Sequence, residues 1–286
     1  MTAITLTANF EYRQLRMVQD LEPSEDGTIF GFLDNGMMYE PDVAHVMMRA
    51  LHDGDVALDV GANIGFFTVM MAALTGPQGR VVAFEPGPDN LVRLRRNVVV
   101  SGVRNVTIVE QPASDVAGPA QFYLNSDAGG GHALWDPGRF PGNAKSRADV
   151  RVARVAATTL DAVVADLDLP APRLIKIDTE GAEHRVLTGA AGLLRECRVP
   201  YIIAELHEFG LAELGSSQRD LRRFMAEQGY ATFGLYFDGA MPKLIPPETS
   251  LRPPHIINLL FSTVEDVARL WQMEQFDPRA TVPAAR

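Results

Sequence analysis

The stretch LDVGANIGFF, residues 58–67, decides the fold, because it joins two apolar runs through Asp59, Gly61, Asn63 and Gly65. The run that ends at Leu58 predicts a short buried strand, and the run that begins at Phe66 predicts an apolar helix. A strand stopped by glycines and followed at once by a helix is the usual start of a nucleotide-binding βα unit. The stretch therefore predicts an α/β fold with a ligand site at its first turn.

Apolar strands and helical segments alternate along the following chain. Strands are expected at 81–84, 106–109, 120–124, 174–177, 201–206, 231–237 and 256–261, and helices at 89–101, 183–195 and 218–228. Such alternation predicts a mostly parallel sheet with helices on both faces. The last two strands follow one another without a helix between them, so we expect an antiparallel pair at one edge.

Three segments are expected to be particular to this protein. Residues 1–50 predict an N-terminal helical and extended segment, with helices at 10–21 and 41–51, that caps the active site or makes a dimer contact. The glycine- and proline-rich stretch 126–146 is far longer than a usual connection, and it predicts a lid over the substrate. Residues 263–286 predict a C-terminal helix and tail.

Composition narrows the possible partners and the compartment. The formal net charge of -10 argues against a mainly electrostatic grip on nucleic acid or on anionic lipid. No apolar run reaches the length of about 18 residues that a membrane span needs, and no secretory signal is visible. The single cysteine, Cys197, excludes an intramolecular disulfide and fits a reducing cytoplasm. We expect a cytoplasmic protein with a small-molecule partner, and a homodimer remains open.

Two cofactors are compatible with the first βα unit, NAD and S-adenosylmethionine. Glu85 ends a strand 20 residues after Gly65, the spacing at which an acid reaches a ribose diol of either cofactor. A dinucleotide fingerprint needs a middle glycine for close approach to the pyrophosphate, whereas Asn63 lies near that position. Asp59 suits a cation such as a sulfonium and would repel a diphosphate. The pattern favours S-adenosylmethionine, with an NAD-dependent oxidoreductase as the alternative.

Five motifs then occur in order: DVGANIGFFT, VVAFEPGPDN, TTLDAVV, LIKIDTEGAEHRVLTGA and IIAELHE. With them, the chain resembles the FkbM family of S-adenosylmethionine-dependent methyltransferases over residues 56–210. The resemblance implies a class I methyltransferase (Rossmann-like) domain over residues 51–262 and methyl transfer, commonly to a hydroxyl of a sugar or natural product. A catalytically silent binding subunit with the same fold is the alternative. The resemblance also implies cofactor contacts at Asp59, Gly61, Asn63, Gly65, Glu85 and, after the third strand, Ser114.

Candidate catalytic residues follow the fourth and fifth strands of the expected sheet. Asp178 ends the strand at 174–177, and Glu205 and His207 close the next strand two residues apart, so they point to the same side. We expect all three beside the reactive methyl group, with Asp178 also bound to the cofactor. An imidazole titrates near neutrality, so His207 is the expected general base and Asp178 positions the acceptor. Helix capping is the alternative for Asp178 and Glu180.

Acceptor contacts are expected from His132, Trp135 and Glu180. Trp135 and Phe140 could stack on a sugar ring, although both could instead anchor the long loop to the domain. The spacing of Asp178, Glu205 and His207 matches no recognised metal signature, so no metal is predicted. The expected acceptor is a small hydroxylated molecule.

Overall fold

A computed structural model of the chain describes residues 2–10, 13–21, 27–196, 199–251 and 256–272. Cys197 and most of the predicted C-terminal tail lie outside these residues. Within them, no helix is long and apolar enough to cross a bilayer.

The core is an eight-stranded sheet in which five adjacent strands, reaching one edge, are parallel. Its order is β11 (Lys243–Ile245), β10 (Ala231–Gly234), β12 (Ile257–Ser262), β9 (Tyr201–Leu206), β8 (Leu174–Ile177), β3 (Val56–Val60), β4 (Arg80–Phe84) and β5 (Val106–Val109). Strand β12 runs antiparallel to both β9 and β10. This is the predicted class I methyltransferase arrangement, and the predicted edge pair is confirmed as β10 and β12. Strand β11, which the sequence did not predict, extends that edge.

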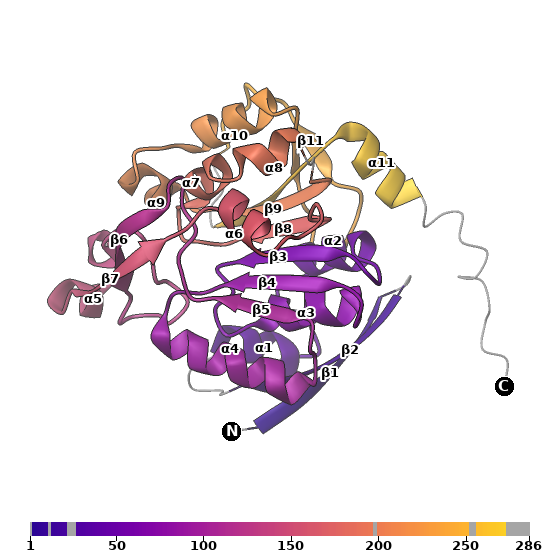
Figure 1. Cartoon of the computed structure of the whole chain (residues 1–286), viewed down its shortest axis with the longest axis horizontal. Helices are drawn as coiled ribbons and strands as arrows, with labels where there is room; N and C mark the ends of the chain where they lie inside the picture. Colours follow the sequence, from indigo (N-terminus) through magenta and orange to yellow (C-terminus); the bar gives the residue numbers. More distant parts are fainter. Residues whose placement is uncertain (1, 11–12, 22–26, 197–198, 252–255, 273–286) are drawn as a thin grey trace, which may run out of the picture.

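Helices cover both faces of the sheet because each buried strand presents apolar side chains to both sides (Figure 1). Ala57 of β3 joins a core with α2 (Pro41–Ala50) and α3 (Phe66–Thr75), while the next residue, Leu58, joins a second core. Helices of the second core are α6 (Leu160–Asp166), α7 (Glu183–Thr188), α8 (Ala191–Glu196), α9 (Glu208–Glu213) and α10 (Gln218–Glu227). Further helices are α1 (Gly27–Asp34), α4 (Pro88–Ser101), α5 (Ala144–Ala148) and α11 (Val264–Gln272).

The N-terminal segment corrects one prediction. The helix expected at residues 10–21 is wrong, because β1 (Thr2–Phe10) and β2 (Arg13–Leu21) form an antiparallel hairpin. Leu15 and Met17 are buried on either side of exposed Arg16, the period-two pattern of a strand. The helix expected at 41–51 is confirmed as α2, which begins with proline. Residues 13–21 form a strand rather than a helix because β2 packs against α3 and α4.

Two other segments differ in detail from the sequence expectation. The single helix expected at 183–195 is divided into α7 and α8 around Gly189, where a Cβ atom would lie 2.1 Å from the Ser114 carbonyl oxygen. The strand expected at 120–124 is confirmed as β6 (Gly118–Leu124), which pairs with the unpredicted β7 (Arg151–Ala157). Figure 1 shows this hairpin and α5 beyond the sheet end toward which β3, β4 and β5 point.

Candidate active site

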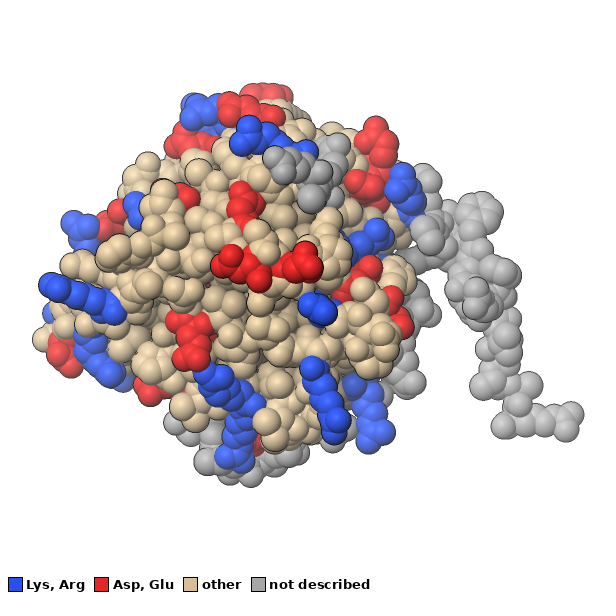
Figure 2. Space-filling view, in the orientation of Figure 1, with Lys and Arg blue, Asp and Glu red and all other residues tan. Residues whose placement is uncertain are grey.

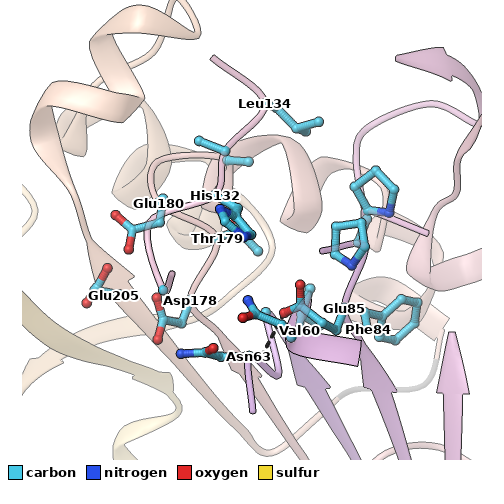
Figure 3. A pocket seen from close by; sticks show the side chains of 18 of the residues that line it. Val60, Asn63, Phe84, Glu85, His132, Leu134, Asp178, Thr179, Glu180 and Glu205 are labelled. Carbon is cyan, nitrogen blue, oxygen red and sulfur yellow. Dashed lines mark hydrogen bonds between the residues drawn. The ribbon is translucent and has the colours of Figure 1, made fainter. Parts of the chain in front are cut away.

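A cavity lies at the carboxyl ends of β3, β4, β8 and β9, where parallel strands place the turns that follow them. Figure 3 shows Asp178, Glu180 and Glu205 on one side of this cavity and Glu85 beside Asn63 on another. The stretch predicted to be a lid, residues 126–146, lines part of it with Gly130, His132, Ala133 and Leu134. The N-terminal segment contributes Tyr39 and Glu40. We call this space the cofactor cavity.

The first turn shows why glycine is needed after β3. Gly61 has φ +83°, and a Cβ atom there would lie 1.7 Å from the Asp178 carbonyl oxygen. Gly61 and Asn63 both line the cofactor cavity. Gly65 does not line it; a Cβ atom there would meet Leu94, so this glycine allows α3 to pack on α4. Gly65 thus has a packing role in the structure, and its predicted cofactor contact stays a prediction.

Glu85 occupies the position predicted for the ribose acid. Its carboxylate accepts hydrogen bonds from the backbone N–H groups of Asn63, at 2.8 Å, and Gly87, at 2.7 Å. Burial raises the pKa of Glu85 to about 7, against the lowering effect of these hydrogen bonds. A fixed carboxylate at the end of the second strand can accept hydrogen bonds from a diol.

Asp59 lies below the cofactor cavity rather than in its wall. It is fully buried, accepts a hydrogen bond from the Thr68 hydroxyl at 2.5 Å, and lies directly opposite Lys176 in the register of β3 and β8. The Lys176 ammonium donates to the Asp178 carboxylate at 3.0 Å and lies over the ring of Phe67. Burial disfavours the Lys176 charge, but the surrounding carboxylates raise its pKa above the ordinary value. The predicted direct contact of Asp59 with the cofactor is not supported.

Asp178, Glu180 and Glu205 form a carboxylate cluster, each offering one oxygen within 4.8 Å of the others. Burial raises the pKa of Glu180 to about 8, with Asp178 and Glu183 adding to it. Burial and the neighbouring acids hold the pKa of Glu205 well above its usual range. The cluster suits a cation, either a charged group of the cofactor or a divalent ion, so the prediction that no metal binds stays untested.

His207, the predicted base, is engaged in helix capping. It precedes α9, and its Nδ1 accepts a hydrogen bond from the Gly210 N–H at 2.9 Å, so the proton of the neutral ring lies on Nε2. That Nε2 lies 3.5 Å from a Glu180 carboxylate oxygen. Burial lowers the pKa of His207. His207 does not line the cofactor cavity but lines a second cavity beside it, together with Glu180, Trp135 and Phe140.

The lid residues divide between the two cavities. Trp135 is only 6% exposed, donates from Nε1 to the Glu180 carbonyl oxygen at 2.5 Å, and packs on Phe209. These contacts favour the interpretation that Trp135 anchors the loop. His132 accepts a hydrogen bond from the Asn125 N–H and lines the cofactor cavity next to Gly87, on the side of the predicted ribose position.

Ser114 lies outside the described lining of the cofactor cavity, and three candidate residues of the site were not predicted. The Ser114 hydroxyl donates to Asp115 and does not face the cofactor cavity, which Pro112 and Ala113 line instead. The three residues that were not predicted are Tyr39, Glu40 and Lys176. Lys176 had a visible signal, because a lysine inside the apolar strand LIKI requires a buried partner.

The charge of the lining indicates the kind of ligand. Glu40, Glu85, Asp178, Glu180 and Glu205 line the cofactor cavity, and none of the described lining residues is lysine or arginine. An acidic wall fits the sulfonium and ammonium groups of S-adenosylmethionine, and the Glu85 carboxylate fits its ribose. A diphosphate would be repelled.

Comparisons with known proteins agree with this geometry. The family model described as the methyltransferase FkbM domain matches residues 59–232, more than half of the chain. A hexuronic acid methyltransferase from Haloferax volcanii is 26% identical over 194 residues, covering 68% of this chain and 70% of that protein. The 31-O-demethyl-FK506 methyltransferase of Streptomyces tacrolimicus is 33% identical over 178 residues, covering 55% and 67%.

Among solved structures, a methyltransferase from Aquifex aeolicus that depends on S-adenosylmethionine aligns with a TM-score of 0.40 at 12% identity, covering 85% of this chain and 98% of that one. The family match extends from Asp59 in the first motif to Thr232 in β10, and so includes every strand-end turn of the cofactor cavity. The chain therefore belongs to the FkbM family of S-adenosylmethionine-dependent methyltransferases.

Proposed function

We propose that this methyltransferase acts on a hydroxyl oxygen of a sugar or natural-product-type small molecule. The observation that carries the proposal is the second cavity, which adjoins the acid-lined cofactor cavity at Asn63 and Glu180. Its lining combines aromatic side chains, such as Phe140, with amides, such as Asn125 and Asn143. Such a mixture suits a hydroxylated ring. The names of the two relatives, which mention a hexuronic acid and demethyl-FK506, support the same class of acceptor.

In this proposal, Glu85 and the backbone at Asn63 hold the ribose, and the carboxylate cluster faces the positive end of the cofactor. S-adenosylmethionine supplies an electrophilic methyl group. The chain must align the acceptor oxygen with that group and accept the proton of the hydroxyl. The geometry supports His207 poorly as the base, because the Nδ1 lone pair that could take up a proton already accepts a hydrogen bond from the Gly210 N–H. We therefore assign proton uptake to a carboxylate.

The surface charge supports a small acceptor over a nucleic acid. On the face shown in Figure 2, lysine and arginine side chains are interspersed with acidic ones. The net charge of the chain is -10. A protein that tracks a phosphate backbone is expected to gather its basic side chains on one face.

Methyl transfer from labelled S-adenosylmethionine to two probes, p-nitrophenyl β-D-glucuronide and 31-O-demethyl-FK506, tests the proposal. We expect label in at least one probe, held as an ether that survives mild alkali. A base-labile ester would indicate carboxyl methylation and contradict the proposal. Cofactor binding measured by calorimetry without transfer to either probe would favour the silent binding subunit, and heat from NAD alone would favour the oxidoreductase.

A further inference from the structure

Glu40 and Glu205 lie where the cofactor cavity meets a groove on the side of β9, β10 and β12. Both residues line the cofactor cavity and also line this groove. The remaining lining is mostly apolar and includes Phe32, Pro41, Leu235, Tyr236, Phe237 and Ile256. We call it the apolar groove. A molecule lying in it meets the cofactor cavity at these two carboxyl groups.

The apolar groove offers large apolar side chains to solvent. The Phe237 side chain is 68% exposed, Tyr236 is 45% exposed and Ile256 is 47% exposed. Exposed apolar side chains that gather at one site commonly mark a binding surface. Glu40 lines both this groove and the cofactor cavity, and Ile256 lines both this groove and the second cavity. An acceptor whose hydroxylated ring lies in the second cavity can therefore place its apolar body in the apolar groove, with the reacting hydroxyl at Glu40.

Glu40 has an environment suited to taking up a proton near neutral pH. Burial raises its pKa to about 7, opposed by the Lys176 charge and by a hydrogen bond with Tyr39, while Asp178 and Asp42 raise it. Burial and the neighbouring acids, Glu40 among them, hold the pKa of Glu205 on β9 well above its usual range. Two neighbouring carboxyls in one site can divide the roles of base and hydrogen-bond donor.

The backbone at Glu40 also has an uncommon conformation. Its φ of 41° and ψ of 67° lie in the left-handed region, directly before Pro41 begins α2. Non-glycine residues hold such angles only where the surroundings enforce them, and they concentrate at functional sites. Here the conformation sets the carboxylate at the junction of the cofactor cavity and the apolar groove.

We propose that Glu40 is the general base of the methyl transfer, acting on an acceptor alcohol whose apolar body lies in the apolar groove. This inference rests on the proposed O-methylation. The acceptor hydroxyl gives its proton to Glu40, and its oxygen forms a bond to the methyl carbon. The carbon–sulfur bond breaks with its electron pair remaining on sulfur, which releases S-adenosylhomocysteine. Glu205, in its protonated form, would donate a hydrogen bond that positions the acceptor oxygen.

Glu40→Gln tests the base, with Asp34→Asn as the control, because Asp34 is an exposed acid of the same N-terminal segment. Single-turnover transfer to 31-O-demethyl-FK506 should fall by about 100-fold or more in Glu40→Gln. Calorimetric affinity for S-adenosylmethionine should change by less than about threefold. The wild-type rate should rise with pH and level off above about pH 7, and this rise should disappear in Glu40→Gln. Asp34→Asn should match the wild type throughout.

Phe237→Ser tests the apolar groove, with Leu244→Ser as the control, because Leu244 is exposed on β11 but does not line the groove. Calorimetry with the S-adenosylhomocysteine complex should show weaker binding of 31-O-demethyl-FK506 to Phe237→Ser by about 10-fold, with unchanged binding of S-adenosylhomocysteine. In turnover, KM should rise and kcat should stay the same.

The outcomes separate this inference from the proposed function. If the wild type transfers no methyl group to a hydroxyl, O-methylation itself fails. If the wild type methylates a hydroxyl but Glu40→Gln keeps the wild-type rate, Glu40 is not the base, and O-methylation stands. The same conclusion holds if Glu40→Gln loses affinity for S-adenosylmethionine as strongly as it loses rate. Glu40→Asp shortens the side chain by one methylene and, if the inference holds, gives a rate between those of the wild type and Glu40→Gln. It also replaces Glu40→Gln if that variant does not fold. Equal acceptor binding by Phe237→Ser and Leu244→Ser would refute the apolar groove.

Discussion

Lys176→Met removes a buried positive charge beneath the cofactor cavity. The register of β3 and β8 places this lysine directly opposite Asp59. Lys176 is 3% exposed, and its ammonium donates to Asp178 at 3.0 Å. Methionine keeps the length of the side chain and its contact with the ring of Phe67. Breaking a buried ion pair from one side costs about 3–5 kcal/mol of unfolding free energy. Because the Asp178 side chain is 26% exposed and can hydrate, we expect the fully buried Asp59 to account for most of this cost.

The destabilisation should depend on pH with a definite sign. Burial raises the folded-state pKa of Asp59, and the Lys176 charge holds it down, so Lys176→Met raises this pKa further. An acid whose pKa is raised on folding destabilises the protein progressively as pH rises from its unfolded pKa to its folded pKa. The unfolding free-energy difference between wild type and Lys176→Met should therefore be smaller at about pH 5 than at about pH 8.

Urea unfolding of the wild type, Lys176→Met, Asp59→Asn and the double variant measures these free energies at both pH values. If the orphaned Asp59 charge causes the loss, the double variant should recover at least about half of it, with a coupling of about 1–3 kcal/mol. A Lys176→Met variant within about 1 kcal/mol of the wild type at pH 8 would refute the reasoning. So would a double variant that is no more stable than Lys176→Met.

Three further variants test other parts of the site. Gly61→Ala places a Cβ against the Asp178 carbonyl at a positive φ, so calorimetry should show loss of S-adenosylmethionine binding and a lowered Tm. Glu85→Gln removes the charge at the ribose position and should weaken S-adenosylmethionine binding by about 10–100-fold in the same assay, with little change in Tm. His207→Ala removes the cap of α9 and should lower Tm by about 2–4 °C, while the single-turnover rate of methyl transfer stays within about threefold of wild type. A large loss of this rate with intact cofactor binding would indicate that His207 is the base after all.

The site residues at the strand ends could be predicted from the sequence because parallel strands share a direction. Strands that alternate with helices bring their carboxyl ends to one edge, so residues far apart in sequence gather there. Gly61, Asn63, Glu85, Asp178 and Glu205 all line the cofactor cavity as expected. The same rule could not identify which strand-end residues face the cavity. It therefore included Gly65 and Ser114, whose surroundings are set by α4 and by Asp115.

The residues that the N-terminal segment contributes to the cofactor cavity could not be predicted from sequence patterns, for a different reason. Tyr39 and Glu40 reach the cofactor cavity because α2 packs on α3, a contact that no local periodicity encodes. The helix predicted at residues 10–21 was wrong for a similar reason. Strand β2 packs on α3 and α4, and Gln19 donates a long-range hydrogen bond to the Phe66 carbonyl oxygen, contacts that the pattern within residues 10–21 does not encode.

Asp59 shows how a correctly chosen residue can have a different physical role from the expected one. Its acidity was interpreted as a direct attraction for a cationic cofactor, yet it lies under the turn and opposite Lys176. Lys176 in turn donates to Asp178, which does line the cofactor cavity. The acid of the first motif thus stabilises the charge of Lys176, and Lys176 keeps the Asp178 carboxylate fixed in place at the site. The DVGANIG and KIDTEGAE segments are thus linked through buried charges, and a buried charge without a partner is costly.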